Sequence, residues 1–238
     1  MNNFIYTPPQ FPRLDLLYRD PYIAVINKPS GLLSVPGRLS EHYDSVLSRI
    51  RDFCPQSAAV HRLDMDTSGI MVFPLCKLAI SALGVQFEKR LVRKIYLAEV
   101  EGHLCGEGCI NAPLRCDWEH RPLQIVDQNL GKKALTFYQA IIQKEHSSLI
   151  MLVPHTGRSH QLRVHMAHLE HPILGDRFYG DPKDDSPLHL HASLLTFNHP
   201  TLGNELIFTS IPSFAAQNIS KSFLCDALKA NFFHRENV

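Results

Sequence analysis

The sequence predicts an α+β fold built on a mostly antiparallel sheet. Strand-like runs outnumber helical patterns, and successive strands are often joined by short polar turns. Strands and helices do not alternate along the chain, as the βαβ units of a parallel sheet would require. With 238 residues, the chain can bury a sizeable core, either in one large domain or in two small lobes.

The predicted strands are short runs rich in β-branched and apolar residues. The first, YIAVIN, stops at Lys-Pro-Ser-Gly, which is typical of a strand that enters a turn. Two pairs of runs are separated by polar turns and are expected to form hairpins, namely 135–142 with 148–153 and 191–197 with 205–209. Strands are expected at residues 22–27, 69–74, 95–100, 135–142, 148–153, 191–197 and 205–209.

Three segments predict helices. Asp44 is expected to cap a first helix that runs through Arg51, and residues 77–90 have apolar residues near helical spacing. Ser159 is expected to cap a third helix that runs to about Glu170 and is closed by His171-Pro172. The tail, residues 216–238, can add a further helix.

The overall charge of the chain does not by itself indicate a nucleic-acid partner, because the formal charge is only +1 and the pI is about 7.7. Basic residues are nevertheless clustered locally. Residues 88–94 hold four cations against one carboxylate, and residues 154–168 hold two arginines and four histidines without an acid. The chain could therefore present one basic face on a nearly neutral body, although solvated surface charge also explains the first cluster.

Targeting and redox features point to the cytoplasm. The chain start lacks the basic and apolar regions of a signal peptide, and no apolar segment approaches the ~20 residues of a membrane-spanning helix. The six cysteines include no CxxC pair and are interpreted as reduced thiols.

A polar loop carries the chemistry. Residues 61–69 read HRLDMDTSG between an apolar lead-in and a buried strand, where polar groups are costly unless they find partners or serve a function. Residues 66–69 are explained by a turn in which their polar side chains form hydrogen bonds with the nearby backbone. Such a turn accounts less well for Arg62 and Asp64, because alternating residues of an extended segment can point to the same side.

Several chemistries remain open for this loop. A hydrolase using Asp64 and Asp66 is one, although an aspartic protease would need a second aspartate from another half or a partner. A non-catalytic RNA-binding module is another. A catalytic metal is disfavoured, because His165 and His168 lack the glutamate of a His-Glu-x-x-His motif and arginines nearby would repel a cation. The uneven spacing of Cys105, Cys109 and Cys116 also disfavours zinc.

The nonapeptide 61–69 resembles the signature of the RluA-type pseudouridine synthases, which reads His-Arg-Leu-Asp, two variable residues and Thr-Ser-Gly. Further segments resemble other motifs of the family in the same order along the chain. These are NKPSGL at 27–32, RKIY at 93–96, TGRSHQLRVH at 156–165, HPILGDRFY at 171–179 and HASLLTFNHP at 191–200. The resemblance spans roughly residues 20–210.

This resemblance implies a fold and substrates. It implies the pseudouridine synthase fold, an α+β structure whose mixed sheet forms two lobes around a central RNA-binding cleft. Residues 1–215 would be the catalytic domain, and 216–238 a tail. The first motif starts at Asn27, which leaves no room for the S4-type domain of many relatives. The run 27–38 is most similar to the dual-specificity branch, whose partners are a tRNA anticodon stem-loop and a 23S rRNA hairpin. A monomer without a cofactor or metal is expected.

The resemblance also implies roles for individual residues. Asp64 would be the catalytic nucleophile or base, Arg163 its counter-ion, and Tyr96 the residue that stacks on the uracil and handles a proton. Arg62 would fill the space left by the flipped base. Further substrate-binding residues would be His61, Arg158 and Leu162.

Overall fold

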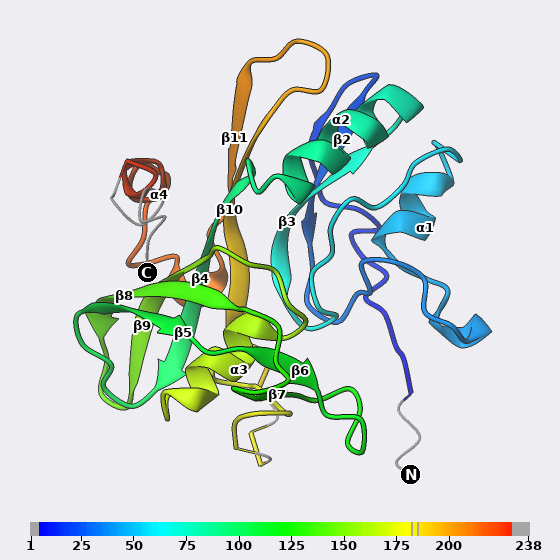
Figure 1. The fold of residues 1–238 in the computed structure, drawn as a ribbon. Helices are drawn as coiled ribbons and strands as arrows, with labels where there is room; N and C mark the ends of the chain where they lie inside the picture. Colours follow the sequence, from blue (N-terminus) through cyan, green and yellow to red (C-terminus); the bar gives the residue numbers. More distant parts are fainter. Residues whose placement is uncertain (1–4, 182, 185, 230–238) are drawn as a thin grey trace. The chain divides into compact units, whose positions relative to one another are not determined.

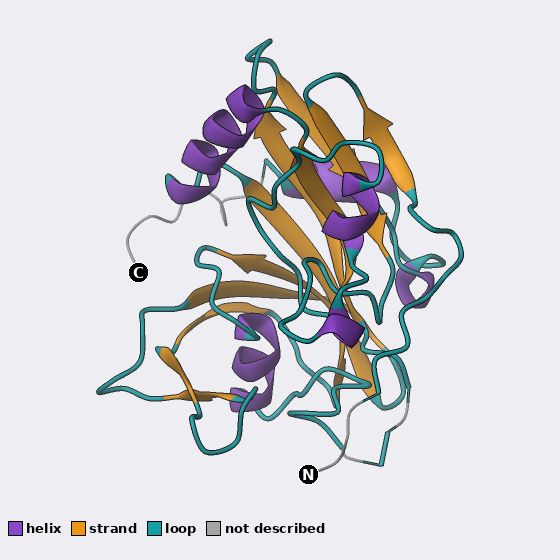
Figure 2. Ribbon diagram, turned by 90° about the vertical axis from the view of Figure 1, so that its right-hand side faces the viewer, coloured by secondary structure: helices purple, strands orange, loops and turns teal. Residues whose placement is uncertain are grey.

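The computed structural model describes residues 5–181, 183–184 and 186–229. The chain forms two compact units, each made from two chain segments. The first unit holds Met1–Val92 and Leu195–Ser210, and the second holds Arg93–Leu194 and Ile211–Val238. Strands outnumber helices in the described residues (Figure 2), and every strand pair whose register is defined is antiparallel. The predicted α+β class is therefore confirmed.

The first unit is a small sheet with two helices. Strand β2 lies between β1 and β3, and helix α2 runs beside β3 (Figure 1). Its core joins Ile23 and Val25 of β2 to Ile70 of β3 and to Leu195 and Phe197 of the later segment. The elements are β1 (Leu16–Arg19), β2 (Ile23–Lys28), the 3₁₀ helix η1 (Ser40–His42), α1 (Val46–Arg51), β3 (Ser68–Pro74), α2 (Lys77–Glu88) and β11 (Glu205–Thr209), which pairs with β10 (Leu190–Asn198).

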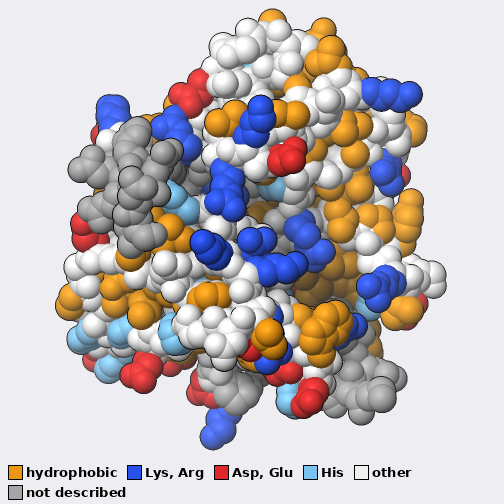
Figure 3. Space-filling model, viewed as in Figure 1, with side chains coloured by type: hydrophobic (Ala, Val, Ile, Leu, Met, Phe, Trp, Pro, Cys, Tyr) orange, Lys and Arg blue, Asp and Glu red, His pale blue; other side chains and the backbone are white. Residues whose placement is uncertain are grey.

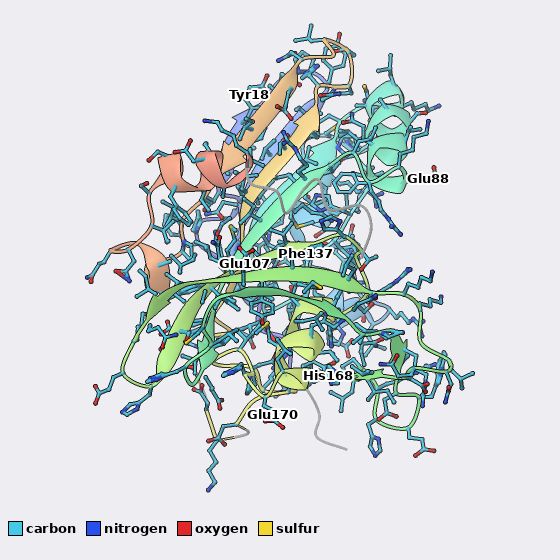
Figure 4. All side chains as sticks on the ribbon, turned by 60° about the vertical axis from the view of Figure 1, so that its left-hand side comes forward. Tyr18, Glu88, Glu107, Phe137, His168 and Glu170 are labelled. Atoms are coloured by element: carbon cyan, nitrogen blue, oxygen red, sulfur yellow. The ribbon has the colours of Figure 1, made fainter. Side chains whose placement is uncertain are left out.

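The second unit contains antiparallel strands in the order β4-β9-β8-β5 and a separate pair β6-β7. Helix α3 lies against these strands, and Figure 4 labels Phe137 on β8 and His168 and Glu170 near the end of α3. The elements are β4 (Arg93–Glu101), β5 (Glu107–Asn111), β6 (Leu114–Cys116), β7 (Gln124–Val126), β8 (Leu135–Gln143), β9 (Ser147–Pro154), α3 (Gln161–His168), the 3₁₀ helix η2 (Ser213–Ala215) and α4 (Lys221–Ala227).

All seven predicted strands form, with ends within two residues of the predicted bounds, and both predicted hairpins pair. Strands β1, β5, β6 and β7 were not predicted from the sequence. Each has three to five residues, and β1, β5 and β7 have at most one buried residue each, so no apolar pattern marks them.

The start of α1 differs from the prediction. The N-cap is Ser45, whose hydroxyl accepts a hydrogen bond from the Ser48 amide while the Ser48 hydroxyl accepts one from the Ser45 amide. Asp44 instead accepts two hydrogen bonds from the buried Arg49 guanidinium, at 2.8 and 2.7 Å. The Asp44 carboxylate pairs with the buried Arg49 cation, and the next residue, Ser45, is therefore the N-cap.

The start of α3 also differs, because Ser159 is not its cap. The N-cap position is His160, in the left-handed region with φ 53°, and it makes no side-chain capping bond. The Gln161 side chain instead orders the turn before the helix, since its Oε1 accepts from the Arg158 amide and the Thr156 hydroxyl. The helix ends at His168, and Glu170 at φ 61° turns the chain away before Pro172.

Part of the tail is structured within the second unit. Ile219, Leu224 and Leu228 are buried in the same core cluster as Ile95 and Phe137. Residues 230–238, which the sequence assigns to the same tail, lie outside the described residues. The roles of residues 1–215 as the catalytic domain and of the tail stay predictions.

On the face drawn in Figure 3, Lys and Arg side chains are more prominent than Asp and Glu, and apolar side chains are exposed among them. Among the described residues, no helix is long and apolar enough to cross a membrane.

Candidate active site

Lys28, a buried lysine at the end of β2, holds the polar loop 61–67 through a hydrogen bond. The Lys28 ammonium donates to the carbonyl oxygens of Pro29 at 2.9 Å, Leu32 at 2.7 Å and Met65 at 2.7 Å, and its side chain is 1% exposed. An ammonium has three donors, so these carbonyls use all of them. Lys28 therefore ties the turn after β2 directly to the residue that follows Asp64.

Two serines extend this clamp. The Ser30 hydroxyl donates to the Asp66 carbonyl at 2.7 Å, and the Ser34 hydroxyl donates to the Leu63 carbonyl at 2.7 Å and accepts from the Leu63 amide. Gly31 completes the clamp, since its amide donates to the Met65 carbonyl and its φ of +81° suits a glycine. The backbone on both sides of Asp64 is thus fixed by residues 28–34, with the NKPSGL segment holding the residues after Asp64 and Ser34 holding the residue before it.

Burial lowers the pKa of Lys28 to about 7, while the negative charges of Asp66 and Asp64 oppose that shift. Asp64 is partly exposed and Arg62 is exposed, so the loop carries both side chains at the surface of the first unit. That the guanidinium and the carboxylate point to the same side of the segment stays a prediction.

His61 begins the loop and anchors it to the sheet. Its ring lies stacked on Phe87 with centroids 4.5 Å apart, and its Nε2 accepts a hydrogen bond from the Val72 amide at 3.0 Å. That acceptor role places the ring proton on Nδ1 in the neutral imidazole. These contacts are structural, and binding of substrate by His61 stays a prediction.

In the second unit, Arg163 lies on α3 and pairs with Asp176. Its Nε and Nη2 donate to the two carboxylate oxygens at 2.7 and 2.6 Å, with both side chains almost completely buried. Phe178 and Tyr179 flank the guanidinium at 5.1 and 5.3 Å from its Cζ to the ring centroids. Arg163 is thus not an ordinary helix-face arginine. Since Asp64 belongs to the first unit, the pairing of Asp64 with Arg163 stays a prediction.

Tyr96 and Leu162 also belong to the second unit. Tyr96 lies on β4 opposite Leu152 of β9, is partly buried, and packs against a core cluster of this unit. Leu162 is 7% exposed in the same cluster, which leaves little of its side chain for a substrate. Their contacts with a uridine stay predictions.

Arg158 is exposed just before α3, and its Nε donates to the Lys133 carbonyl at 3.1 Å. That contact holds the guanidinium against the backbone of Lys133, whose own side chain is exposed. Binding of substrate by Arg158 stays a prediction.

Several histidines of the 155–171 segment have protein partners. His160 Nδ1 lies 2.8 Å from the Tyr179 hydroxyl, and His171 Nδ1 lies 2.7 Å from the Glu101 carbonyl. Both ring nitrogens of His165 are engaged, by the Thr136 hydroxyl at 2.9 Å and the Ala112 carbonyl at 3.0 Å. These contacts support packing as the role of His165, in place of metal binding.

Two residues of this site were given no role from the sequence. Lys28 and Asp176 both lie inside segments that resemble family motifs, but neither is near Asp64 or Arg163 in the sequence. A lysine that ends a β-branched strand and an aspartate in a Gly-Asp turn were the available signals. What makes them important is burial, which a single sequence does not reveal.

Residues 22–168 match the RNA pseudouridylate synthase family, which is more than half of the chain. The protein belongs to the RNA pseudouridylate synthase family, and its activity is that of an RNA pseudouridine synthase.

Similar proteins agree with this placement. The chain is 50% identical over 214 residues to the dual-specificity RNA pseudouridine synthase RluA of Escherichia coli K12, covering 88% of this chain and 98% of that protein. The same named enzyme of Haemophilus influenzae is 48% identical with the same coverage. The solved structure of human RNA pseudouridylate synthase domain containing 1 matches with a TM-score of 0.77 and 28% identity over 94% of this chain and 98% of that one.

Proposed function

We propose that this pseudouridine synthase has dual specificity and acts on both a 23S rRNA hairpin and a tRNA anticodon stem-loop. The observation that carries the proposal is the 50% identity to enzymes named for dual specificity, along nearly their whole length. A difference of substrate class would need altered RNA contacts, and the loop 61–69 and the NKPSGL segment that braces it both retain the family pattern. The protein acts as a monomer in the cytoplasm.

The reaction breaks the bond between uracil N1 and ribose C1′, turns the base, and joins C5 to C1′. The proton that leaves C5 is balanced by a proton that N1 takes up, so the product is an isomer of the substrate. No electrons are gained or lost and no group leaves the nucleotide, so the chemistry needs no cofactor. A carboxylate can attack C1′ or C6, or remove the C2′ proton, and it leaves readily afterwards. Asp64 is the carboxylate that the braced loop presents.

The other groups act around this step. A uridine within a stem or tight loop must be flipped out, at a cost of a few kcal/mol. Stacking on Tyr96 contributes roughly 1–3 kcal/mol and offsets much of that cost. Arg62 is exposed two residues before Asp64. Its planar guanidinium can occupy the space that the flipped uracil leaves between the neighbouring bases. Arg163, fixed in orientation by Asp176, serves as the counter-ion of Asp64.

One experiment tests the proposal. Transcripts of a tRNA anticodon stem-loop and of a large-subunit rRNA hairpin, each tritiated at uracil C5, are incubated with the wild-type protein and with Asp64→Asn. Release of tritium to water from both transcripts by the wild type, and from neither by the variant, is expected. Release from only one transcript rejects dual specificity, and full release by Asp64→Asn rejects the role of Asp64.

A further inference from the structure

The β6-β7 hairpin of the second unit carries the chain's only tryptophan at its tip. Trp118 is 67% exposed, although a large aromatic ring usually contributes most when it is buried or bound to a partner. The family resemblance assigns it no role. An exposed tryptophan on a hairpin is a candidate contact for a ligand with a flat, apolar face.

One neighbour orients this ring. The Arg121 guanidinium lies over the Trp118 ring, with its Cζ 3.7 Å from the ring centroid. A guanidinium stacked on an indole restricts rotation of both side chains and places a positive charge directly beside the aromatic surface. The pair thus presents an aromatic plane and a cation together.

The tip that carries the pair is well ordered by hydrogen bonds. Asp117 accepts from the amides of Glu119 and His120 and from the His120 ring, and its own amide donates to the Leu123 carbonyl at 2.9 Å. The Leu123 amide donates back to His120. A tip held in this way loses little conformational entropy when it binds a partner.

The hairpin is also tied to the neighbourhood of Arg163. The Gln124 amide donates to the Tyr179 hydroxyl at 2.8 Å, and the same hydroxyl lies 2.8 Å from His160 Nδ1. The Tyr179 ring in turn flanks the Arg163 guanidinium. Trp118 therefore stands on an element that is hydrogen-bonded to the candidate active site of this unit.

Charge near the hairpin favours an anionic partner. Lys132 is bridged to Leu114 of β6, Arg158 contacts the Lys133 carbonyl, and all three cationic side chains are exposed. The carboxylate of Asp127 is paired with Arg115, and that of Asp117 with His120. Glu119 is the remaining acid of the tip, so positive charge exceeds negative charge on this surface.

We propose that the β6-β7 tip is an RNA-docking surface, on which an unpaired base of the substrate stacks on Trp118 while Arg121, Lys132, Lys133 and Arg158 contact its phosphates. Bases present a π-face whatever their identity, and phosphates follow at every nucleotide, which fits an aromatic ring flanked by cations. The proposal rests on the proposed function, because it names a further contact for the same RNA substrates.

Binding of a fluorescently labelled anticodon stem-loop transcript tests this directly, in an Asp64→Asn background that prevents turnover. Trp118→Ala should weaken binding by about tenfold, while Trp118→Phe, which keeps an aromatic face, should retain most of the affinity. Leu202→Ala, at a similarly exposed apolar residue with 74% exposure in the first unit, is the matched control and should bind as the parent does. Equal affinities of Trp118→Ala and the parent would overturn the proposal.

The intrinsic fluorescence of the protein gives an independent readout, because Trp118 is the only tryptophan. The transcript should shield Trp118 from quenching by acrylamide, and unchanged quenching at saturating RNA would count against docking. Tritium release by the wild type separates the two proposals. Release together with an unaffected Trp118→Ala variant rejects only the docking surface, whereas no release rejects the proposed function itself.

Discussion

Arg163 and Asp176 form a bidentate ion pair, with both side chains almost completely buried in the second unit. The Asp176 carboxylate also accepts hydrogen bonds from the amides of Phe178 and Tyr179, so four donors converge on it. Gly175 precedes it at φ +71°, where an added Cβ would lie 2.2 Å from the Pro187 carbonyl oxygen. The direction of the Arg163 guanidinium is therefore built into the turn 173–179.

We expect Asp176→Asn to cost about 3–5 kcal/mol in the free energy of unfolding, since it leaves the buried Arg163 charge without this carboxylate. Urea unfolding measures the effect. The control is Asp52→Asn in the exposed pair with Arg13, whose side chains are 58% and 60% exposed, where a loss below about 1 kcal/mol is expected. Equal losses in the two variants would show that Asp176 does not stabilise a buried charge.

Lys28 should make stability depend on pH. Its pKa in the folded protein is about 7, below the ordinary value of 10.5, so between these values the unfolded chain holds a proton that the folded chain has released. The free energy of unfolding should then rise with pH in that window, by up to about 1.4 kcal/mol per pH unit from this group. Below about pH 7 both states are protonated and the contribution is constant.

The Lys28→Met variant isolates this contribution, because methionine does not titrate. The difference in unfolding free energy between wild type and variant should be flat below pH 7 and grow in favour of the wild type above it. A difference that stays constant up to about pH 10 would contradict a lowered pKa of Lys28.

His165 should make the stability of the protein depend on pH at the acidic end of the range. Burial lowers its pKa below the ordinary value of 6.5, because the ring is enclosed between Thr136 and Ala112. The unfolded chain therefore binds the proton first as the pH falls, and the stabilisation is lost progressively below about pH 6.5. Thermal unfolding at about pH 7.5 and about pH 5 should show a smaller drop for His165→Gln than for wild type. Identical drops would exclude this histidine as a source of acid sensitivity.

The two caps that differ from the sequence prediction give a matched pair of substitutions. Ser45→Ala removes the observed cap of α1 and should cost about 1 kcal/mol, whereas Ser159→Ala, at the cap predicted for α3, should cost close to nothing. Both are measured by urea unfolding under the same conditions. A larger loss for Ser159→Ala would mean that its hydroxyl has a structural role that the capping geometry does not show.

The fold class and the long strands could be predicted because their apolar patterns are strong. The short strands carry no such pattern, and both predicted caps were wrong because nearby polar side chains form other hydrogen bonds. Asp44 pairs with Arg49, and Gln161 bonds to Thr156 and the Arg158 amide in the turn before α3. Local preference was overridden in each case by a buried polar group that needed satisfaction.

The candidate site was predictable for a different reason. Asp64, Arg62 and Tyr96 stand in segments whose order resembles a known family, so their roles came with the resemblance. Lys28 holds the backbone beside Asp64, and Asp176 holds the Arg163 guanidinium; only three-dimensional contacts identify these two supporting residues. A pattern of residue types predicts which groups contact the substrate, but not which groups hold them in place.

The division of the chain into interleaved segments has a consequence for its synthesis. The core of the first unit needs Leu195 and Phe197, which emerge from the ribosome only after nearly all of the second unit has been translated. The sheet that supports the loop with Asp64 is therefore incomplete until β10 has been synthesised. An enzyme built this way cannot begin to modify RNA while most of its own chain is still being made.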